Sequence, residues 1–230
     1  MIKLIRFIIK FVLKILGIFV LLSVSLTLLY KWIPVPITPL MVIRLLNPEI
    51  GKIQKEWISL DKISEYMILA VIVHEDQNFF DHTGFDFNAI QKAWEENNKK
   101  NRIKRGASTI SQQTAKNVFL WPQRSWARKG LEVWFTFLIE TFWSKKRILE
   151  VYLNVIETGK GLYGVEAASS KYFGKPASKL SPEEAALIAA ILPAPLKLSA
   201  INPGPYIKER QKWVLKQMQL WGMQVNRNEF

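Results

Sequence analysis

The longest run of apolar residues lies near the start of the chain. Residues 15–30 carry no charged side chain, and with their flanks they approach the roughly 20 residues that a helix needs to span a bilayer. Four basic residues precede this uncharged run: Lys3, Arg6, Lys10 and Lys14. Basic residues on that side are typical of an N-terminus that stays in the cytoplasm. The pattern predicts an uncleaved transmembrane helix, with Tyr30 and Trp32 at the far interface.

A cleaved signal peptide is the alternative interpretation of the same run. It needs a shorter apolar core that ends in a small-residue cleavage site. The best candidate, Ser23-Val24-Ser25, lies inside the run, and Leu26 to Leu29 continue it. We therefore favour the anchor. Either interpretation places the chain from Tyr30 onward outside the cytoplasm.

Beyond the anchor, apolar residues recur at helical spacing and no segment keeps a period of two, so the fold class is mainly α. Seven helices are predicted: Ser64 (N-cap) to Glu75, Asp86 to Trp94, Ser108 (N-cap) to Asn117, Trp126 to Trp143, Lys145 to Ile156 after Ser144, Ser181 (N-cap) to Leu192, and Tyr206 to Trp221 before Gly222. The Ser181 start is the clearest, because Pro182 and Glu184 complete a capping box.

The segments between these helices suggest how the chain is organised. Pro34, Pro36 and Pro39 predict a stiff, extended exit from the membrane, and residues 97–105 predict a polar, basic loop. The sequence predicts three parts: a cytoplasmic N-terminus with the transmembrane anchor (1–33), a linker and membrane-proximal segment (34–58), and a globular domain (59–230).

The distribution of charge narrows the choice of partners. The formal net charge is +13, and residues 1–33 hold five of the 32 basic residues and none of the 19 acids. Nucleic acid is a common partner of basic proteins, but the topology argues against it. Anionic lipid headgroups or a pyrophosphate-bearing lipid fit better. Charge that only keeps a solvated face soluble is the simpler alternative.

One predicted helix has an unusual composition. The stretch GASTISQQTAKN, residues 106–117, contains no acid, no histidine and a single cation, Lys116. Its other polar side chains are hydroxyls and amides, and Ser108, Gln112 and Lys116 share one face. Such a face suits a ligand that combines sugar hydroxyls with phosphate. A polar helix whose groups are satisfied by its own domain is the alternative.

A second segment, HEDQNFFDHTGFD (residues 74–86), offers a candidate acid–base group. Glu75 stands at a predicted helix end beside Asp76, with three phenylalanines close by. A carboxylate in apolar surroundings can have its pKa raised and serve in acid–base catalysis. A glutamate that only caps a helix end above a core of phenylalanines is the alternative, and spacing alone does not separate the two.

Two short motifs in the chain are weak. His74-Glu75 begins an HExxH zinc-protease motif, but position 78 is asparagine, and the chain has only two histidines and no cysteine. Residues 159–164 match GxGxxG, yet a helical pattern precedes them where a dinucleotide site needs a strand. These glycines are better explained by a helix end and a close backbone approach.

Taken together, four longer segments resemble the peptidoglycan glycosyltransferases, the lysozyme-like glycosyltransferase family 51. They occur in the order of the family motifs: EDQNFFDHTG (75–84), GASTISQQTAKN (106–117), RKGLE (128–132) and ILEVYLN (148–154), the last running on to Gly159, Gly161 and Gly164. Ala167-Ala168 and Tyr172-Phe173-Gly174-Lys175 follow in the same order. The resemblance covers roughly residues 60–195. Several long motifs in one order are far more specific than one short pattern.

The resemblance implies a lysozyme-like domain that polymerises lipid II into β-1,4 glycan strands and releases undecaprenyl pyrophosphate. The growing strand is the donor, and the acceptor's 4-hydroxyl attacks its anomeric carbon with inversion. Glu75 is implied as the general base, and Glu132 as a second catalytic carboxylate at the donor pyrophosphate or in positioning. Lys116 and Arg124 are implied to bind the pyrophosphate. The remaining cleft residues are implied to be Asp76, Ser108, Gln112, Gln113, Asn117, Arg128 and Lys129.

The resemblance also implies the surroundings of the enzyme. The partners are lipid II, the growing glycan strand and inner-membrane lipids, together with other cell-wall synthesis proteins, and no nucleic acid. We expect no required cofactor and no metal ligands; a divalent cation such as Mg²⁺ or Mn²⁺ could screen the pyrophosphate. We expect a single-pass protein of the inner membrane whose catalytic domain faces the periplasm. Phe119, Leu120, Trp121, Trp126 and Trp134 are candidates for contact with the interface.

Two rival functions remain at this point. A lytic glycosidase of lysozyme-like fold would share a catalytic glutamate and a sugar cleft, but it has no pyrophosphate to stabilise. The basic residues Lys116, Arg124, Arg128 and Lys129 therefore favour the transferase. A non-catalytic membrane scaffold is the second rival, and it predicts that Glu75→Gln affects nothing beyond stability.

Overall fold

The computed structural model describes residues 2–48, 50–99 and 108–222. The chain divides into two compact units, Met1–Pro34 and Val35–Phe230, and each is described by itself. The predicted boundary after residue 58 falls inside the second unit and stays a prediction.

The first unit is one helix, α1 (Ile2–Trp32), which is long and apolar enough to cross a membrane. At 1.5 Å per residue its 31 residues extend about 46 Å, more than the hydrocarbon thickness of a bilayer. Its polar hydroxyls are satisfied inside the helix: Thr27 Oγ1 donates to the carbonyl of Ser23 at 2.8 Å. The predicted apolar helix is therefore present and is consistent with a membrane anchor; it also takes in the basic residues that precede the apolar run.

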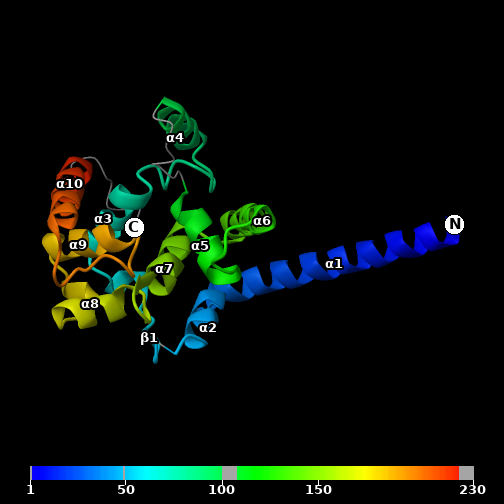
Figure 1. The fold of residues 1–230 in the computed structure, drawn as a ribbon, viewed down its shortest axis with the longest axis horizontal. Coiled ribbons are helices and arrows are strands. Elements are labelled where there is room, and N and C mark those ends of the chain that lie inside the picture. The colour runs from blue at the N-terminus through cyan, green and yellow to red at the C-terminus, as the bar shows by residue number, and fades with distance from the viewer. Residues whose placement is uncertain (1, 49, 100–107, 223–230) are drawn as a thin grey trace. The chain divides into compact units, whose positions relative to one another are not determined.

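The second unit is mainly helical, as predicted, and is drawn in Figure 1. Its α-helices are α2 (Pro39–Leu45), α3 (Glu65–Glu75), α4 (Phe87–Lys99), α5 (Ile110–Phe119), α6 (Trp126–Phe142), α7 (Lys145–Val155), α8 (Val165–Phe173), α9 (Pro182–Ile191) and α10 (Pro205–Gly222). Two short 3-10 helices cover Leu60–Lys62 and Ala177–Lys179. The part of the chain that the structure describes also has three strands: β1 (Gln54–Lys55), β2 (Glu157–Gly159) and β3 (Leu162–Tyr163).

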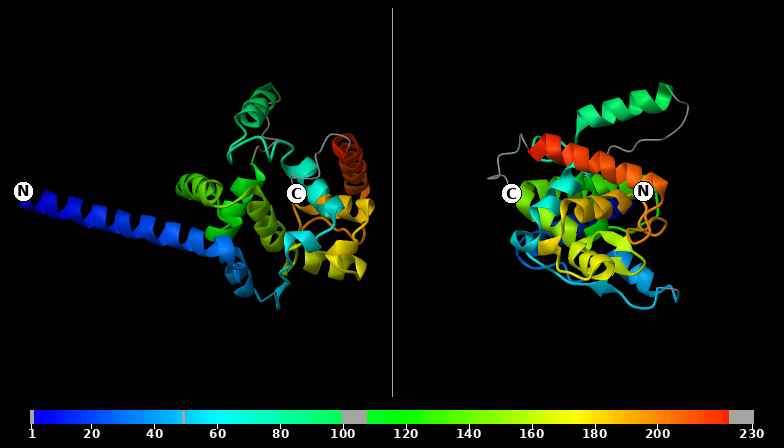
Figure 2. Two further views of the ribbon diagram at one scale, coloured as in Figure 1. Left: turned by 180° about the vertical axis from the view of Figure 1, so that it is seen from behind. Right: turned by 90° about the vertical axis from the view of Figure 1, so that its left-hand side faces the viewer.

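The helices of this unit form two groups that meet at the end of α3. In the first group α3, α9 and α10 pack against one another; in the second, α5 packs against α6 and α7. Figure 2 shows the same two groups from behind and from the side, with α4 projecting away from both. Helix α3 is buried around most of its circumference, with Met67, Ala70 and Val71 inaccessible to solvent. The core thus fixes the C-terminal end of α3 against α5.

A small sheet of order β1-β3-β2 was not predicted. Strand β1 pairs in parallel with β3, and β2 pairs with β3 antiparallel, so the GxGxxG segment forms a hairpin. Gly164 has a φ of 80°, and an added Cβ would lie 2.9 Å from the carbonyl oxygen of Asn154. The close backbone approach is confirmed. The sequence suggested that these glycines end a helix. Gly164 is instead the N-cap of α8, so it begins one.

Helices α2 and α8 were not predicted, and several helix boundaries differ from the prediction. Pro39 starts α2, because proline is well suited to the first helical position, so the exit from α1 is not extended throughout. Residues 97–99 continue α4 where a loop was predicted. The rest of that predicted loop, and Gly106 and Ala107 at the start of the GASTISQQTAKN segment, lie outside the described residues. The N-cap of α5 is Thr109, one residue after the predicted Ser108.

Candidate functional site

Glu75 is the last residue of α3, and both of its carboxylate oxygens are held by neighbouring side chains. His74 Nδ1 lies 2.8 Å from Glu75 Oε1. Gln113 Nε2, from α5, donates to Glu75 Oε2 at 2.7 Å. The side chain of Glu75 is 13% exposed, so it still reaches solvent. The group is thus oriented by two elements and open on one side.

These contacts change the sign of the expected pKa shift. Burial alone raises the pKa of Glu75, as the sequence suggested, but the hydrogen bond and electrostatic influence of His74, the hydrogen bond from Gln113 and the positive charge of Lys116 together lower it further than burial raises it. The net pKa of Glu75 is below the ordinary value of a glutamate. The carboxylate is therefore ionised near neutral pH, which is the state that a general base needs.

Asp76 follows Glu75 in the chain and joins α3 to the start of α5. Its Oδ2 accepts the backbone N–H of Ile110 at 2.9 Å, and both oxygens lie 3.0 Å from His82 Nε2. The residue is buried. The assignment of Asp76 to substrate binding stays a prediction; in this structure the residue anchors the beginning of α5.

The polar residues of α5 divide between two tasks. Thr109 and Gln112 form a reciprocal capping box in which Gln112 Oε1 accepts the N–H of Thr109 at 3.1 Å, so Gln112 is buried and committed to the helix start. Ser108 lies just before this cap and is exposed. Gln113 is in contact with Glu75 and also accepts a hydrogen bond from the hydroxyl of Tyr152 on α7 at 3.3 Å.

Lys116 is one turn beyond Gln112 and faces both predicted carboxylates. Burial is the main influence that lowers its pKa; Arg128 and Lys129 lower it as well, and Glu132 and Glu75 offset this only in part. Among residues 2–48, 50–99 and 108–222, none forms a hydrogen bond or an ion pair with its ammonium group. Lys116 is therefore a partly buried cation whose donors are available to an anion.

Glu132, in α6, is 3% exposed and is bound by two cations of its own helix. Arg128 Nη1 lies 2.8 Å from Glu132 Oε2, and Lys129 Nζ lies 2.5 Å from Glu132 Oε1. Within the described part of the chain, Arg128 Nε is buried without a hydrogen-bond partner. An unpaired buried donor is costly, so this N–H favours an acceptor that the protein itself does not supply.

A pocket of about 240 Å³ lies beside these groups. Gln113, Lys116 and Asn117 line one wall, so three of the predicted cleft residues do meet. Arg44 and Glu157 line another wall and form a bidentate ion pair, with Arg44 Nε 2.9 Å from Glu157 Oε1.

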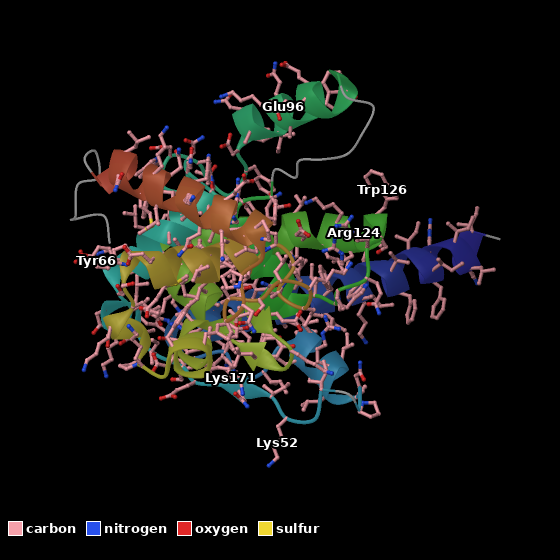
Figure 3. The ribbon with its side chains drawn as sticks, turned by 60° about the vertical axis from the view of Figure 1, so that its left-hand side comes forward. Lys52, Tyr66, Glu96, Arg124, Trp126 and Lys171 are labelled. Atoms are coloured by element: carbon pink, nitrogen blue, oxygen red, sulfur yellow. The ribbon has the colours of Figure 1, made fainter. Side chains whose placement is uncertain are left out.

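Arg124 lies apart from that pocket. It is exposed in the segment between α5 and α6, near Trp126, as Figure 3 shows. Among the described residues it has no ion-pair partner. Its predicted contact with pyrophosphate, like the contact predicted for the exposed Ser108, stays a prediction.

Sequence reasoning missed the residues that support the site from distant elements. Arg44 and Glu157 have no local signal, because their role depends on which elements the fold brings together. Tyr152 lies within the fourth motif and could have been proposed from that resemblance. No group of three His, Cys, Asp or Glu side chains that could hold a metal ion occurs among the described residues.

The aromatic candidates for membrane contact separate into two classes. Leu120 is buried, and Phe119 stacks on Phe135 with ring centroids 4.3 Å apart, so both belong to the core. Trp126 is 93% exposed and Trp121 is 37% exposed. Trp134 is half-buried, with its ring 6.3 Å from that of Phe137. The contact of these three tryptophans with a bilayer stays a prediction.

The chain was compared with known proteins. The family model described as Transglycosylase matches residues 44–219. The chain is 52% identical over 213 residues to the biosynthetic peptidoglycan transglycosylase of Bdellovibrio bacteriovorus, covering 91% of this chain and 85% of that protein. It is 56% identical over 190 residues to the protein of the same description from Caulobacter vibrioides, covering 82% and 81% of the two chains. The similarity extends over nearly the whole second unit.

Proposed function

This chain belongs to the transglycosylase family, and from that premise we propose how its second unit polymerises lipid II into glycan strands. Its activity is that of a peptidoglycan glycosyltransferase of cell-wall synthesis. The observation that carries the residue assignments is the position of Lys116, which lines the pocket beside Gln113, the residue that donates to Glu75. A base and a cation on neighbouring elements are what a transfer from a pyrophosphate donor requires.

Glu75 is the general base of this proposal. The acceptor's 4-hydroxyl gives its proton to the Glu75 carboxylate while its oxygen forms a bond to the anomeric carbon of the donor. The bond between that carbon and the pyrophosphate oxygen breaks on the opposite face, so the configuration inverts. The hydrogen bonds from His74 and Gln113 keep the carboxylate ionised before the reaction and fix its orientation.

Lys116 and Arg124 neutralise the charge that develops on the leaving undecaprenyl pyrophosphate. Both side chains lack an ion pair among the described residues, so their charge is available to the substrate. Arg128 adds the unpaired Nε–H, and Lys129 lies beside it. Glu132 acts in this proposal by holding Arg128 and Lys129 in place, and Asn117, Gln113 and the exposed Ser108 bind sugar and peptide groups.

The surroundings follow from the substrate. Lipid II stays in the bilayer, and α1 is consistent with a single-pass anchor that holds the domain there. We place the catalytic unit on the periplasmic face of the inner membrane, with Trp121 and Trp126 near the lipid. No cofactor is required in this scheme. A divalent cation would bind chiefly to the pyrophosphate oxygens, because the described residues offer no cluster of three metal-ligating side chains.

The first experiment is polymerisation of labelled lipid II by the detergent-solubilised chain, wild type beside Glu75→Gln, with products resolved by length. Long strands from the wild type and a loss on the order of 10²–10⁴-fold in a folded Glu75→Gln would support the proposal. Cleavage of preformed glycan without polymerisation would favour a lytic glycosidase. Neither activity from a folded wild type would favour a scaffold.

A further inference from the structure

The side chain of His74 connects α3 to α10 through its two ring nitrogens. It is only 2% exposed. Nδ1 lies 2.8 Å from Glu75 Oε1. On the other side of the ring, Arg210 donates its Nε–H to His74 Nε2 at 3.1 Å. Arg210 comes from the C-terminal helix, 136 residues away in the chain, and no sequence motif singled it out.

The contact with Arg210 determines the tautomer of His74. An arginine Nε–H can only donate, so His74 Nε2 accepts and carries no proton. A neutral imidazole has one N–H, which must then be on Nδ1. That N–H points at Glu75 Oε1. Arg210 therefore makes His74 a hydrogen-bond donor to the carboxylate.

Arg210 is itself held in position. Its guanidinium carbon lies 4.1 Å from the centroid of the Trp213 ring, in a cation–π contact one turn along α10. The His74 ring meets the same indole edge-on, at 6.4 Å and 78°. Trp213 thus contacts both partners of the hydrogen bond and restricts the rotation of each.

We propose that Arg210 and His74 are positioning residues for Glu75: Arg210 fixes the proton of His74 on Nδ1, and this N–H orients the carboxylate toward the acceptor hydroxyl. The inference rests on the proposed role of Glu75 as base. Each carboxylate oxygen has two acceptor sites. His74 occupies one on Oε1 and Gln113 one on Oε2, which leaves one on each oxygen for the substrate.

The second histidine supplies an internal comparison. His82 Nδ1 accepts the backbone N–H of Gly84 at 3.0 Å, and its Nε2 faces the carboxylate of Asp76 at 3.0 Å. By the same reasoning its proton is on Nε2. The chain has only these two histidines, so the structure assigns opposite tautomers to the only two imidazoles in the molecule.

Nitrogen-15 NMR of the full chain, labelled in its histidine rings and held in detergent micelles at pH 7, tests the tautomers directly. One imidazole is expected to be protonated on Nδ1 and the other on Nε2, and the His74→Asn variant assigns the signals. In Arg210→Met nothing donates to His74 Nε2, so the ring proton is expected to move from Nδ1 toward Nε2; the two His74 resonances should shift in opposite directions while the His82 signals stay. A wild-type His74 with its proton on Nε2 would overturn the proposal.

A double-mutant cycle tests the effect on the reaction. Arg210→Met is expected to lower kcat for lipid II polymerisation about tenfold, the size of one lost hydrogen bond to a charged group, with little change in KM. In His74→Asn, the asparagine Nδ2 takes the place of Nδ1 and keeps the donor to Glu75 without needing Arg210. Adding Arg210→Met to His74→Asn is therefore expected to change kcat by less than about twofold.

Lys212→Met, an exposed change on the same helix, is the matched control, and thermal unfolding of each variant shows whether it is folded. An equal loss from Arg210→Met in both backgrounds would mean that Arg210 acts without His74, and the proposal would be wrong. Failure of the base assignment is distinguishable: a fully active Glu75→Gln would remove the proposed function, whereas the tautomers seen by NMR do not depend on activity.

Discussion

Gln113 Nε2 donates a 2.7 Å hydrogen bond to Glu75 Oε2, so a residue in the polar helix α5 directly contacts the candidate base on α3. The Tyr152 hydroxyl donates to Gln113 Oε1, which fixes the direction of the amide and presents its N–H₂ to Glu75. This pairing gives a physical reason for a glutamine at this position that sugar binding alone does not supply.

Removing this donor is expected to move the acid limb of activity to higher pH. The hydrogen bond favours the ionised carboxylate and lowers the pKa of Glu75, whereas burial raises that pKa. In Gln113→Leu the effect of burial is less opposed, so the pKa of Glu75 rises. As the pH falls, the Glu75 carboxylate is then protonated, and activity is lost, at a higher pH than in the wild type. The measurement is kcat/KM for lipid II between pH 4 and 8. Gln219→Leu, the same change at an exposed position of α10, should keep the wild-type limb; a Gln113→Leu limb at lower pH would contradict the assignment.

Lys116 is expected to set the alkaline limb. Burial lowers the pKa of its ammonium group, so the charge that neutralises pyrophosphate is lost below the pH at which an ordinary lysine deprotonates. Lys116→Arg carries a charge that does not titrate in this range. It should therefore abolish the limb or move it to higher pH, even where the maximum rate falls because the geometry differs. If the alkaline limb of Lys116→Arg lies at the same pH as that of the wild type, a group other than Lys116 causes the limb. Lys146→Arg, the same change in α7, is the control and should leave the alkaline limb where it is in the wild type.

The position of the α5 cap can be tested by two neighbouring alanine substitutions. Thr109→Ala removes the side-chain acceptor of the capping box and the hydroxyl that donates to Gly84 O at 2.7 Å. It should lower the free energy of unfolding by about 1–2 kcal/mol. Ser108→Ala, one residue earlier and exposed, should change it by less than about 0.5 kcal/mol. The measurement is the free energy of unfolding of both variants by chemical denaturation. A larger loss from Ser108→Ala than from Thr109→Ala would mean that Ser108 is the N-cap.

Two glycines should respond to alanine in opposite directions. Gly164→Ala forces a side chain into a left-handed conformation and toward the backbone of Asn154, so it should destabilise the protein by at least about 1–2 kcal/mol. Gly130 lies within α6 with nothing within 4 Å of an added Cβ. Gly130→Ala should stabilise the helix by about 0.5–1 kcal/mol. Thermal unfolding of the pair is the measurement, and equal shifts would show that the close approach at Gly164 can relax.

Local signals predicted much of the helical framework. Ser64 caps α3, and Ser181 with Glu184 forms the predicted capping box of α9, because a cap is a relation between residues three positions apart. The same logic missed by one residue at α5, where Ser108 and Thr109 are both good caps and only Gln112 distinguishes them. The sheet was missed because strands of two or three residues are too short to show a period.

The candidate site was predicted through its motifs, and the contacts within it were not. Sequence placed Glu75, Gln113 and Lys116 among the functional residues, but it could not show that Gln113 contacts Glu75 or that Asp76 binds the start of α5. Such contacts link residues that are 34 or 38 positions apart. The sign of the Glu75 pKa shift depended on them, because the apolar neighbours alone suggested the opposite direction.

The double attachment of Thr109 and Ile110 to Gly84 and Asp76 has a consequence for protein engineering. The chain leaves the site at Gly84 and returns to it at Thr109, with Thr109 Oγ1 2.7 Å from Gly84 O. Helix α4 therefore lies between two points of the chain that are joined by a direct hydrogen bond. Doubling the length of a flexible loop costs only about 0.6 kcal/mol in closure entropy. Helix α4, most of whose described side chains are exposed, is accordingly a natural place to graft a fluorescent reporter or an affinity tag while leaving Glu75 and Gln113 in register.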